Sequence, residues 1–333
     1  MTALLLALSF VLIVGGAVLF TNAVEWLGSR LNLGHGAVGS LLAAVGTALP
    51  ESTIPVVAVL AGAEGEDVAI GAIVGAPFML ATVAMMLVAG SALVFAKRRE
   101  NGRAINMEPG LVRRDFAFFL PSFAAAIAIG QVDSKPLHYA GAAALVAAYG
   151  TYVWLTVRAG GEGDAEEELK PLIFDPSKDD PPATFQIVAQ LLVALALIIV
   201  GAELFVEEIT VVAESLGVET VVLALIIAPL ATELPEKLNS VIWMRKDMDT
   251  LAIGNITGAM VFQSTIPVSI GILFTPWKLD FLTTLASVFA ILSGIVFLGF
   301  LLRRAPLKAF VMLGAGSLYI VFVVTAVVSL IRG

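Results

Sequence analysis

The sequence predicts an all-α, polytopic membrane protein with ten transmembrane helices, arranged as two inverted five-helix repeats. Three observations predict this fold class. Hydrophobic residues occupy 59% of the 333 positions, charged residues occupy only 14%, and the mean hydropathy is +0.97; this composition is typical of integral membrane proteins. Apolar runs of about 20 residues recur, as transmembrane helices require and membrane β-strands do not. Several segments of the first half also recur in the second half.

Ten apolar segments are expected to span the bilayer. The first has no basic stretch before it and is longer than the apolar part of a usual signal peptide, so we expect it to be a transmembrane helix. The ten segments cover residues 2–22, 37–61, 68–95, 116–131, 138–157, 184–207, 217–243, 250–274, 281–301 and 307–330.

The loops between these segments predict an orientation. Fifteen Lys and Arg residues follow odd-numbered segments, and three lie on the opposite side. Cytoplasmic loops are enriched in Lys and Arg, so we expect a multi-pass protein of a prokaryotic cell membrane with both termini outside. The fifteen are Arg30, Lys97, Arg98, Arg99, Arg103, Arg113, Arg114, Arg158, Lys170, Lys178, Arg245, Lys246, Arg303, Arg304 and Lys308, and the three are Lys135, Lys278 and Arg332.

An acidic stretch divides the chain into two halves. Residues 159–183 are expected to form a solvated cytoplasmic linker between a first repeat, 1–158, and a second repeat, 184–333. The segment that begins at Gly16 recurs at Gly201. Because each repeat has an odd number of spans, the second must be inverted in the membrane, a pattern typical of secondary transporters.

One motif occurs in both halves. Gly46-Thr47-Ala48-Leu49-Pro50-Glu51 is matched by Ala231-Thr232-Glu233-Leu234-Pro235-Glu236. Inside a membrane helix a proline costs about 3 kcal/mol, and a charged residue costs roughly 2.5–3.5 kcal/mol. Both copies of the motif retain these two unfavourable residues, a proline and a glutamate. We therefore expect the two copies to form the two halves of one site.

The chemistry of this motif indicates a divalent cation. Pro50 and Pro235 cannot donate to the carbonyls four residues earlier, so we expect two helix breaks with freed carbonyl oxygens. Calcium takes six to eight oxygen ligands in irregular geometry, whereas magnesium requires a near-ideal octahedron and fits less well. Two carboxylates in one pocket are not expected to stay ionised when the ion leaves, so proton uptake follows. The predicted metal ligands are Glu51 and Glu236, with oxygens at Gly46, Thr47, Ala231 and Thr232.

At these residues the chain resembles the calcium/cation antiporter superfamily, which includes the sodium/calcium exchangers. That family carries a Gly-Thr-Ser-x-Pro-Glu break in its second and seventh spans and a Gly-Asn-x-x-Gly-Ser-Asn segment in the third and eighth. The corresponding segments here begin at Gly71 and Gly254. The resemblance implies Ca²⁺ at Glu51 and Glu236, and alternating access in which the first and sixth spans slide against the core.

The chain departs from the family at several polar positions. The motif serines that help to hold sodium are replaced by Ala48, Glu233, Ala76 and Ala259, which disfavours sodium coupling. Lys237 follows Glu233 at the spacing of a helical ion pair, although Pro235 lies between them. If the two residues pair, Lys237 is a fixed internal cation, or its charge alternates with that of the substrate. If they do not pair, Glu233 is a candidate proton carrier. Glu233, Lys237 and Gln263 are the candidate coupling-ion residues.

The predicted function is exchange of Ca²⁺ for a monovalent cation, Na⁺ or H⁺. The alternatives are a cation channel and a divalent-cation sensor that does not transport. An enzyme is not expected, because the sequence contains no nucleophile–base arrangement and no phosphate-binding loop. The expected partners are the lipid bilayer and a divalent cation, with no cofactor and no nucleic acid, and a monomer is expected to suffice for transport.

Overall fold

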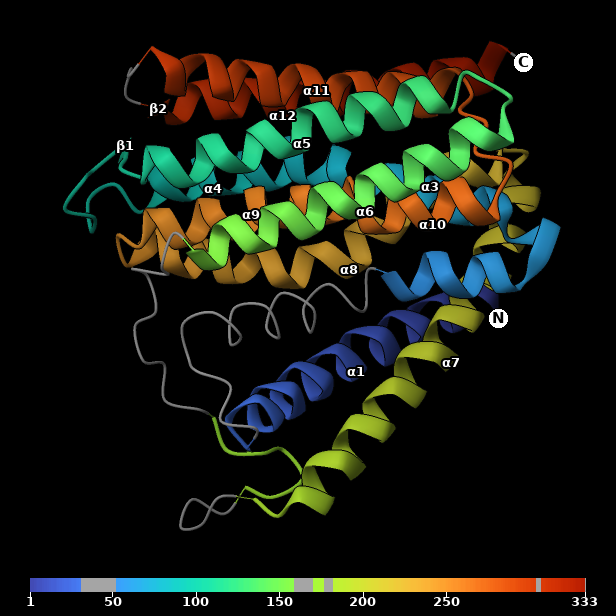
Figure 1. Cartoon of the computed structure of the whole chain (residues 1–333), viewed down its shortest axis with the longest axis horizontal. Helices are drawn as coiled ribbons and strands as arrows, with labels where there is room; N and C mark the ends of the chain where they lie inside the picture. Colours follow the sequence, from blue (N-terminus) through green and yellow to red (C-terminus); the bar gives the residue numbers. More distant parts are fainter. Residues whose placement is uncertain (31–51, 159–169, 177–181, 304–306, 333) are drawn as a thin grey trace.

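The structure is a computed structural model that describes residues 1–30, 52–158, 170–176, 182–303 and 307–332, and it is a bundle of helices (Figure 1). In chain order the elements are α1 (Thr2–Arg30), a helix over 52–60, η1 (Gly62–Glu64), α3 (Glu66–Met79), the π-helix η2 (Leu80–Ala84), α4 (Met85–Val94), β1 (Ala104–Ile105), α5 (Pro109–Ile129), α6 (Lys135–Arg158), α7 (Thr184–Leu216), α8 (Thr220–Arg245), α9 (Asp249–Gln263), α10 (Ile266–Phe274), α11 (Phe281–Leu302), β2 (Leu307–Lys308) and α12 (Ala309–Arg332).

Six candidate spans in the described chain are long and apolar enough to cross a membrane. They are Thr2–Val24, Glu66–Val94, Thr184–Leu216, Asp249–Phe274, Phe281–Leu302 and Ala309–Ser329. Large apolar side chains such as Leu192, Ile295 and Ile320 are exposed on these helices, as expected for contact with lipid. The all-α membrane class is thus confirmed.

Several predicted boundaries differ from the structure. The fourth predicted span starts at Pro109 rather than 116, because a proline at the first helical position needs no donor partner. The sixth extends to Leu216, where Gly217 ends it in the left-handed conformation at φ +65°. The second predicted span, 37–61, lies partly outside the described residues, which include its helix over 52–60.

The predicted eighth span is two helices rather than one. α9 ends at Gln263 and α10 begins at Ile266. Pro267 has no N–H and cannot donate to the Gln263 carbonyl, which explains the interruption. The equivalent stretch of the first half is the π-helix η2, where Ala84 stands in place of the proline.

Hydrogen bonds match at these two irregular stretches. Thr82 and Thr265 lie 183 residues apart, as do Gly71 and Gly254. The Thr82 hydroxyl donates to the Phe78 carbonyl at 2.6 Å, and the Thr265 hydroxyl donates to the equivalent Val261 carbonyl at 2.7 Å. The packing partners match too, because α5 packs on α9 as α11 packs on α3, and α6 packs on α10 as α12 packs on α4.

Helices α1 and α7 form a pair that packs at one side of the main bundle (Figure 1). Their contacts are reciprocal. A Cβ at Gly16 would lie 2.7 Å from Ile198 Cγ1, and a Cβ at Gly201 would lie 2.9 Å from Ile13 Cγ1. The sequence match between Gly16 and Gly201 therefore reflects a shared packing role.

Part of the predicted linker packs against this pair. Leu172 is fully buried, and the Ile173 and Phe174 N–H groups donate to Asn22 Oδ1 at 3.0 Å and Gln190 Oε1 at 2.9 Å. Asn22 belongs to α1 and Gln190 to α7, and Gln190 also donates to Asn22 at 3.0 Å. Residues 170–176 therefore join the two helices, whereas the sequence suggested only a solvated linker.

Helices α3 and α8 pack with their backbones in contact. A Cβ at Gly71 would lie 2.4 Å from the Val221 carbonyl oxygen, and a Cβ at Gly75 would lie 2.2 Å from the Leu225 oxygen. Only glycine permits this approach. At Gly254 and Gly258, in contrast, an added Cβ would meet only side-chain ends among the described residues, at 3.3 and 3.5 Å.

The loops after the third, seventh and ninth predicted spans gather at one end of the bundle. Strands β1 and β2 pair there in antiparallel fashion, with Ala104 opposite Lys308 and Ile105 opposite Leu307. Both chain termini lie at the other end (Figure 1). We call the end that carries β1 and β2 the basic end, because most of the predicted cytoplasmic Lys and Arg residues belong to these loops.

The α3–α8 contact can be tested with one methyl group. We expect Gly75→Ala to lower the melting temperature of the purified protein by several degrees, because its Cβ would overlap the α8 backbone. Gly90→Ala is the matched control, since Gly90 lies in the same predicted span and an added Cβ there would meet no described atom within 4 Å; alanine at this position should be neutral or slightly stabilising. Equal melting temperatures for the two variants would contradict this account of the packing.

Candidate functional site

The structure describes only part of the predicted site. Gly46, Thr47 and Glu51 lie outside the described residues. The second motif lies in α8, where the backbone of Ala231 and Glu236 is helical but their side chains are outside the description. The residues that can be placed in full are Thr232, Glu233 and Lys237 from α8 and Gln263 from α9.

Helix α8 continues through the motif. The sequence predicted a break at Pro235, but Thr220–Arg245 is one helix. An interior proline removes a single hydrogen bond, and Pro77 in α3 and Pro121 in α5 are likewise accommodated without interruption. The chemical consequence remains, because the Ala231 carbonyl still lacks the N–H donor that any other residue at 235 would supply.

An ion pair lies at the middle of α8. Lys237 Nζ is 3.3 Å from Glu233 Oε2, and both side chains are fully buried. Glu233 is about 20 Å along the helix from Thr220 and about 18 Å from Arg245, at 1.5 Å per residue. The continuous helix explains the pairing, since residues four apart then share one face.

Gln263 connects this pair to α9. Its Nε2 donates to Glu233 Oε1 at 3.3 Å, and its side chain is buried. Gln263 is the last residue of α9, next to the interruption before α10. The three candidate coupling-ion residues therefore lie together, with each Glu233 oxygen facing a nitrogen donor.

The polar contacts between α8 and α9 continue toward the basic end. Ser240 is buried, one turn beyond Lys237, and donates to the Ala252 carbonyl at 3.2 Å. Asn255 donates to the Ser240 hydroxyl at 3.4 Å. Sequence reasoning missed Ser240, although the spacing 233, 237 and 240 places all three residues on one helix face.

Thr232 immediately precedes Glu233 in α8 and carries a hydroxyl oxygen. Its side chain is buried, and its hydroxyl donates to the Ala228 carbonyl of its own helix at 3.2 Å. This is the common arrangement for threonine within a helix. The oxygen retains lone pairs for a further partner.

A second buried carboxylate, also missed, lies on the other side of α9. Asp115 of α5 is 1% exposed and accepts hydrogen bonds from the Thr257 hydroxyl at 2.5 Å and the Tyr152 hydroxyl at 3.1 Å. These contacts join α5, α6 and α9. Because Thr257 lies within the Gly254–Gly258 segment, Asp115 helps to hold that segment in place.

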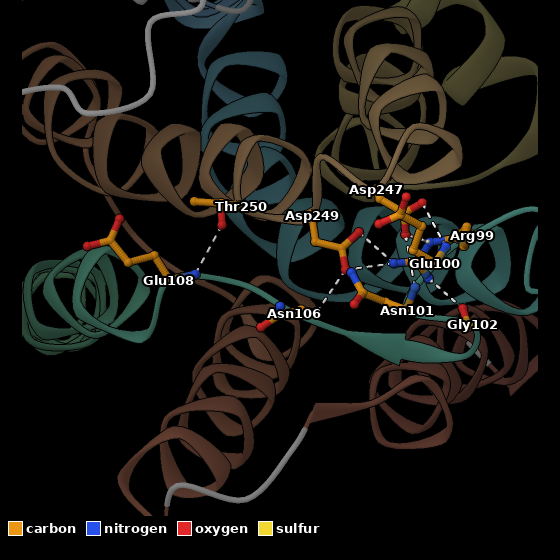
Figure 2. Close-up of polar contacts among 9 residues, drawn as sticks. All are labelled: Arg99, Glu100, Asn101, Gly102, Asn106, Glu108, Asp247, Asp249 and Thr250. Carbon is orange, nitrogen blue, oxygen red and sulfur yellow. Dashed lines mark hydrogen bonds and ion pairs between the residues drawn. The ribbon is translucent and has the colours of Figure 1, made fainter.

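A network at the basic end holds the loops against α9 (Figure 2). Arg99 is fully buried at its side chain and donates to both Asp249 oxygens at 2.6 Å. Asp249 also accepts from the Asn106 N–H at 2.7 Å, and Asp247 accepts from the Glu100 N–H at 3.0 Å. The loop of the first half is thus fixed to the start of α9 in the second half.

Among the described side chains, no group of three or more Asp, Glu, His or Cys residues is placed to hold a metal ion. Glu51 and Glu236, the predicted ligands, are not among those side chains. The described geometry therefore locates the neighbours of the predicted metal site rather than the site itself.

A family model described as "Sodium/calcium exchanger protein" matches residues 1–158 and 186–328. The chain belongs to the sodium/calcium exchanger protein family. Both halves are covered, and the unmatched interval between them, 159–185, contains the predicted linker, 159–183. The resemblance inferred from the paired motifs is confirmed.

One curated protein and two solved structures illustrate what the chain is similar to. Inner membrane protein YrbG of Escherichia coli (strain K12) is 25% identical over 254 residues, which cover 73% of this chain and 70% of that protein. The crystal structure of the H⁺/Ca²⁺ exchanger CAX has a TM-score of 0.74 at 19% identity, covering 98% of this chain and 82% of that one. The sodium-calcium exchanger NCX_Mj, soaked with Na⁺ and Sr²⁺, has a TM-score of 0.60 at 18% identity, covering 97% of each. At these identities the two structures show a shared fold.

The network at the basic end gives a stability prediction for this family member. Arg99→Ala leaves Asp249 buried without its counter-charge, which should cost about 3–5 kcal/mol. The melting temperature of the purified protein measures the loss. Arg103→Ala is the control, because Arg103 is an exposed arginine of the same loop; a loss as large in the control would show that the buried pair is not the cause.

Proposed function

We propose that this chain is a secondary active antiporter that moves Ca²⁺ across a membrane in exchange for a monovalent cation, Na⁺ or H⁺, by alternating access. One observation carries the proposal: a chain that belongs to the exchanger family over both halves keeps buried, charged residues at the middle of α8. The H⁺/Ca²⁺ exchanger CAX and the sodium-calcium exchanger NCX_Mj share this fold, and we extend Ca²⁺ exchange from them to this chain.

The proposed architecture is ten transmembrane helices in two inverted repeats, residues 1–158 and 184–333, joined by the linker 159–183. The matched hydrogen bonds of Thr82 and Thr265 support this architecture. The packing of α5 on α9 and of α11 on α3 supports it as well, because each helix packs on the equivalent helix of the other half. The α9–α10 interruption and η2 then fall at equivalent depths. Interrupted helices near the midplane are typical of transporters with inverted repeats.

The proposed Ca²⁺ site takes one carboxylate from each repeat, Glu51 and Glu236. Oxygens at Gly46, Thr47, Ala231 and Thr232 would complete the ligands. The central position of the second motif in α8 supports this site, because a transporter binds its substrate near the bilayer midplane. The buried Thr232 hydroxyl is an oxygen of the required kind.

The residues favour H⁺ as the counter-ion. Three of the family's sodium-binding serines are alanines here, Ala48, Ala76 and Ala259, and the fourth is Glu233. These replacements remove the neutral hydroxyl oxygens that would bind Na⁺ at these positions. Two glutamates that share a Ca²⁺ ion, in contrast, take up protons when the ion leaves.

Alternating access is proposed to move the α1–α7 pair against the remaining helices. α1 and α7 contact each other extensively, and one buried hydrophobic cluster joins this pair to the helix over 52–60, α3 and α8. Residues 170–176 tie its two members together. A unit that is joined internally and meets its surroundings through apolar side chains is suited to rigid-body motion.

The proposed setting is a prokaryotic cell membrane, with the basic end in the cytoplasm and both termini outside. The position of both termini opposite the basic end supports this orientation (Figure 1). A single copy of the chain contains both halves of the proposed site, so a monomer would suffice, and no cofactor is required. We place the chain among transporters rather than enzymes.

Calcium uptake into proteoliposomes tests the proposal. Purified protein is reconstituted, and ⁴⁵Ca²⁺ uptake is measured with an outward H⁺ gradient, an outward Na⁺ gradient or no gradient. We expect uptake in the H⁺ arm. Uptake in the Na⁺ arm alone would show that Na⁺, rather than H⁺, is the counter-ion. Equal uptake without any gradient would indicate a channel. A failure of uptake with retained Ca²⁺ binding would indicate a sensor.

Charge-removing variants test the two glutamates. Glu51→Gln and Glu236→Gln should each reduce uptake to the level of protein-free liposomes, because the amide cannot neutralise Ca²⁺. Glu214→Gln is the control, since Glu214 is exposed near the end of α7, and it should transport like the unmodified protein. Normal uptake by either motif variant would remove that glutamate from the site.

A further inference from the structure

The ammonium group of Lys237 lies at the place where a cation from solution would otherwise be needed to neutralise Glu233. Glu233 is fully buried at the middle of α8, and Lys237 Nζ is 3.3 Å from its Oε2. Gln263 Nε2 is 3.3 Å from its other oxygen, Oε1. A buried carboxylate is retained only when it is paired with a positive charge or carries a proton.

We propose that Lys237 is a resident cation at Glu233 that takes the place of a transported Na⁺, and that its removal uncovers a Na⁺ site. The role in transport rests on the proposed function, whereas the binding of Na⁺ does not. The ammonium is covalently attached to α8 by a four-carbon stem. It therefore supplies the counter-charge throughout a transport cycle but cannot leave the protein.

The surroundings of the pair have the oxygen chemistry that Na⁺ requires. Glu233 supplies a carboxylate. The Gln263 amide, which presents its nitrogen to Glu233, supplies an oxygen instead when the amide group rotates by half a turn. Pro235 leaves the Ala231 carbonyl, two residues before Glu233, without its helical donor. The C-terminal ends of half-helices coordinate Na⁺ in transporters with inverted repeats, and α9 ends at Gln263.

The continuity of α8 explains why Lys237 is effective. Because Pro235 does not interrupt the helix, positions 233 and 237 remain on one face, one turn apart. A break at Pro235 would have separated them. The Lys237 side chain has no oxygen that could bind a cation. Its positive charge, next to Glu233, therefore repels any second cation from this position.

A purely structural ion pair makes a different prediction. If Lys237 only stabilises the packing of α8, its loss should weaken the protein equally in every salt. If it substitutes for Na⁺, the loss should be reversed specifically and saturably by Na⁺. The two explanations are therefore separated by ion dependence rather than by stability alone.

The experiment measures the melting temperature of the purified full-length protein in detergent at pH 8. Sodium chloride is titrated against choline chloride at constant ionic strength, without Ca²⁺. For Lys237→Met we expect a saturable increase of at least about 2 °C in Na⁺, because a ligand that binds only the folded state stabilises it. The unmodified protein should melt at the same temperature in both salts.

Two further variants serve as controls. Glu233→Gln/Lys237→Met lacks both charges and should not respond to Na⁺, and Lys237→Arg keeps the cation and should behave like the unmodified protein. A Lys237→Met protein without a Na⁺ response, or a response of equal size in the double variant, would overturn the proposal. If Lys237→Met does not fold, Lys237→Gln replaces it, and a saturable Na⁺ response of the unmodified protein would overturn the proposal in any case.

Reconstituted Lys237→Met provides the transport counterpart. We expect its Ca²⁺ uptake to be stimulated severalfold by an outward Na⁺ gradient to which the unmodified protein is indifferent. A lack of Ca²⁺ uptake by the unmodified protein would contradict the proposed function. The Na⁺ effect on melting would still decide the proposal for Lys237, so the two failures are distinguishable.

Discussion

A carboxylate buried in the middle of an apolar helix needs a counter-charge within a few ångströms, and much of this structure follows from how that need is met. Lys237, on the same helix, supplies the counter-charge to Glu233, and Gln263, on the next helix, adds a hydrogen bond. The first contact depends on a helix that continues past a proline. The second depends on α9 ending where it does, so that Gln263 faces α8. The contact with Gln263 could not survive a shift of one helix along the other.

The remaining packing keeps α8 and α9 in that register. Gly71 and Gly75 allow α3 to lie directly against the backbone of α8. Asp115 holds Thr257 from the opposite side of α9, and Arg99 holds Asp249 at its start (Figure 2). Buried charges are costly without partners, and the buried carboxylates Asp115, Glu233 and Asp249 each have a polar partner on another element.

The sequence predicted the features that depend on local composition and missed those that depend on distant partners. Apolar runs correctly indicated the helices, and the spacing of Glu233 and Lys237 correctly indicated that the two could pair. The recurrence of the Gly16 segment at Gly201 indicated two related halves, and these two glycines make reciprocal contacts in the structure.

Three of the features that were not predicted have a clear physical reason. The interruption at Pro267 was hidden because the hydropathy of the whole segment remains that of one span. The continuity of α8 was missed because a proline removes one bond, and neighbouring contacts can compensate. The Arg99–Asp249 pair joins residues 150 positions apart, a separation at which a single sequence gives no sign of contact. The site ligands Glu51 and Glu236 stay predictions.

The reciprocal contacts of Gly16 and Gly201 bear on how such a chain could have arisen. Each glycine receives a side chain from the helix that carries the other, so the interface presents the same patch from both sides. That is the geometry of a two-fold symmetric dimer. A single ancestral unit with this helix could have paired with its own copy through the same surface. Fusion of two such units would have preserved the contact, and thereafter each half would have constrained changes in the other.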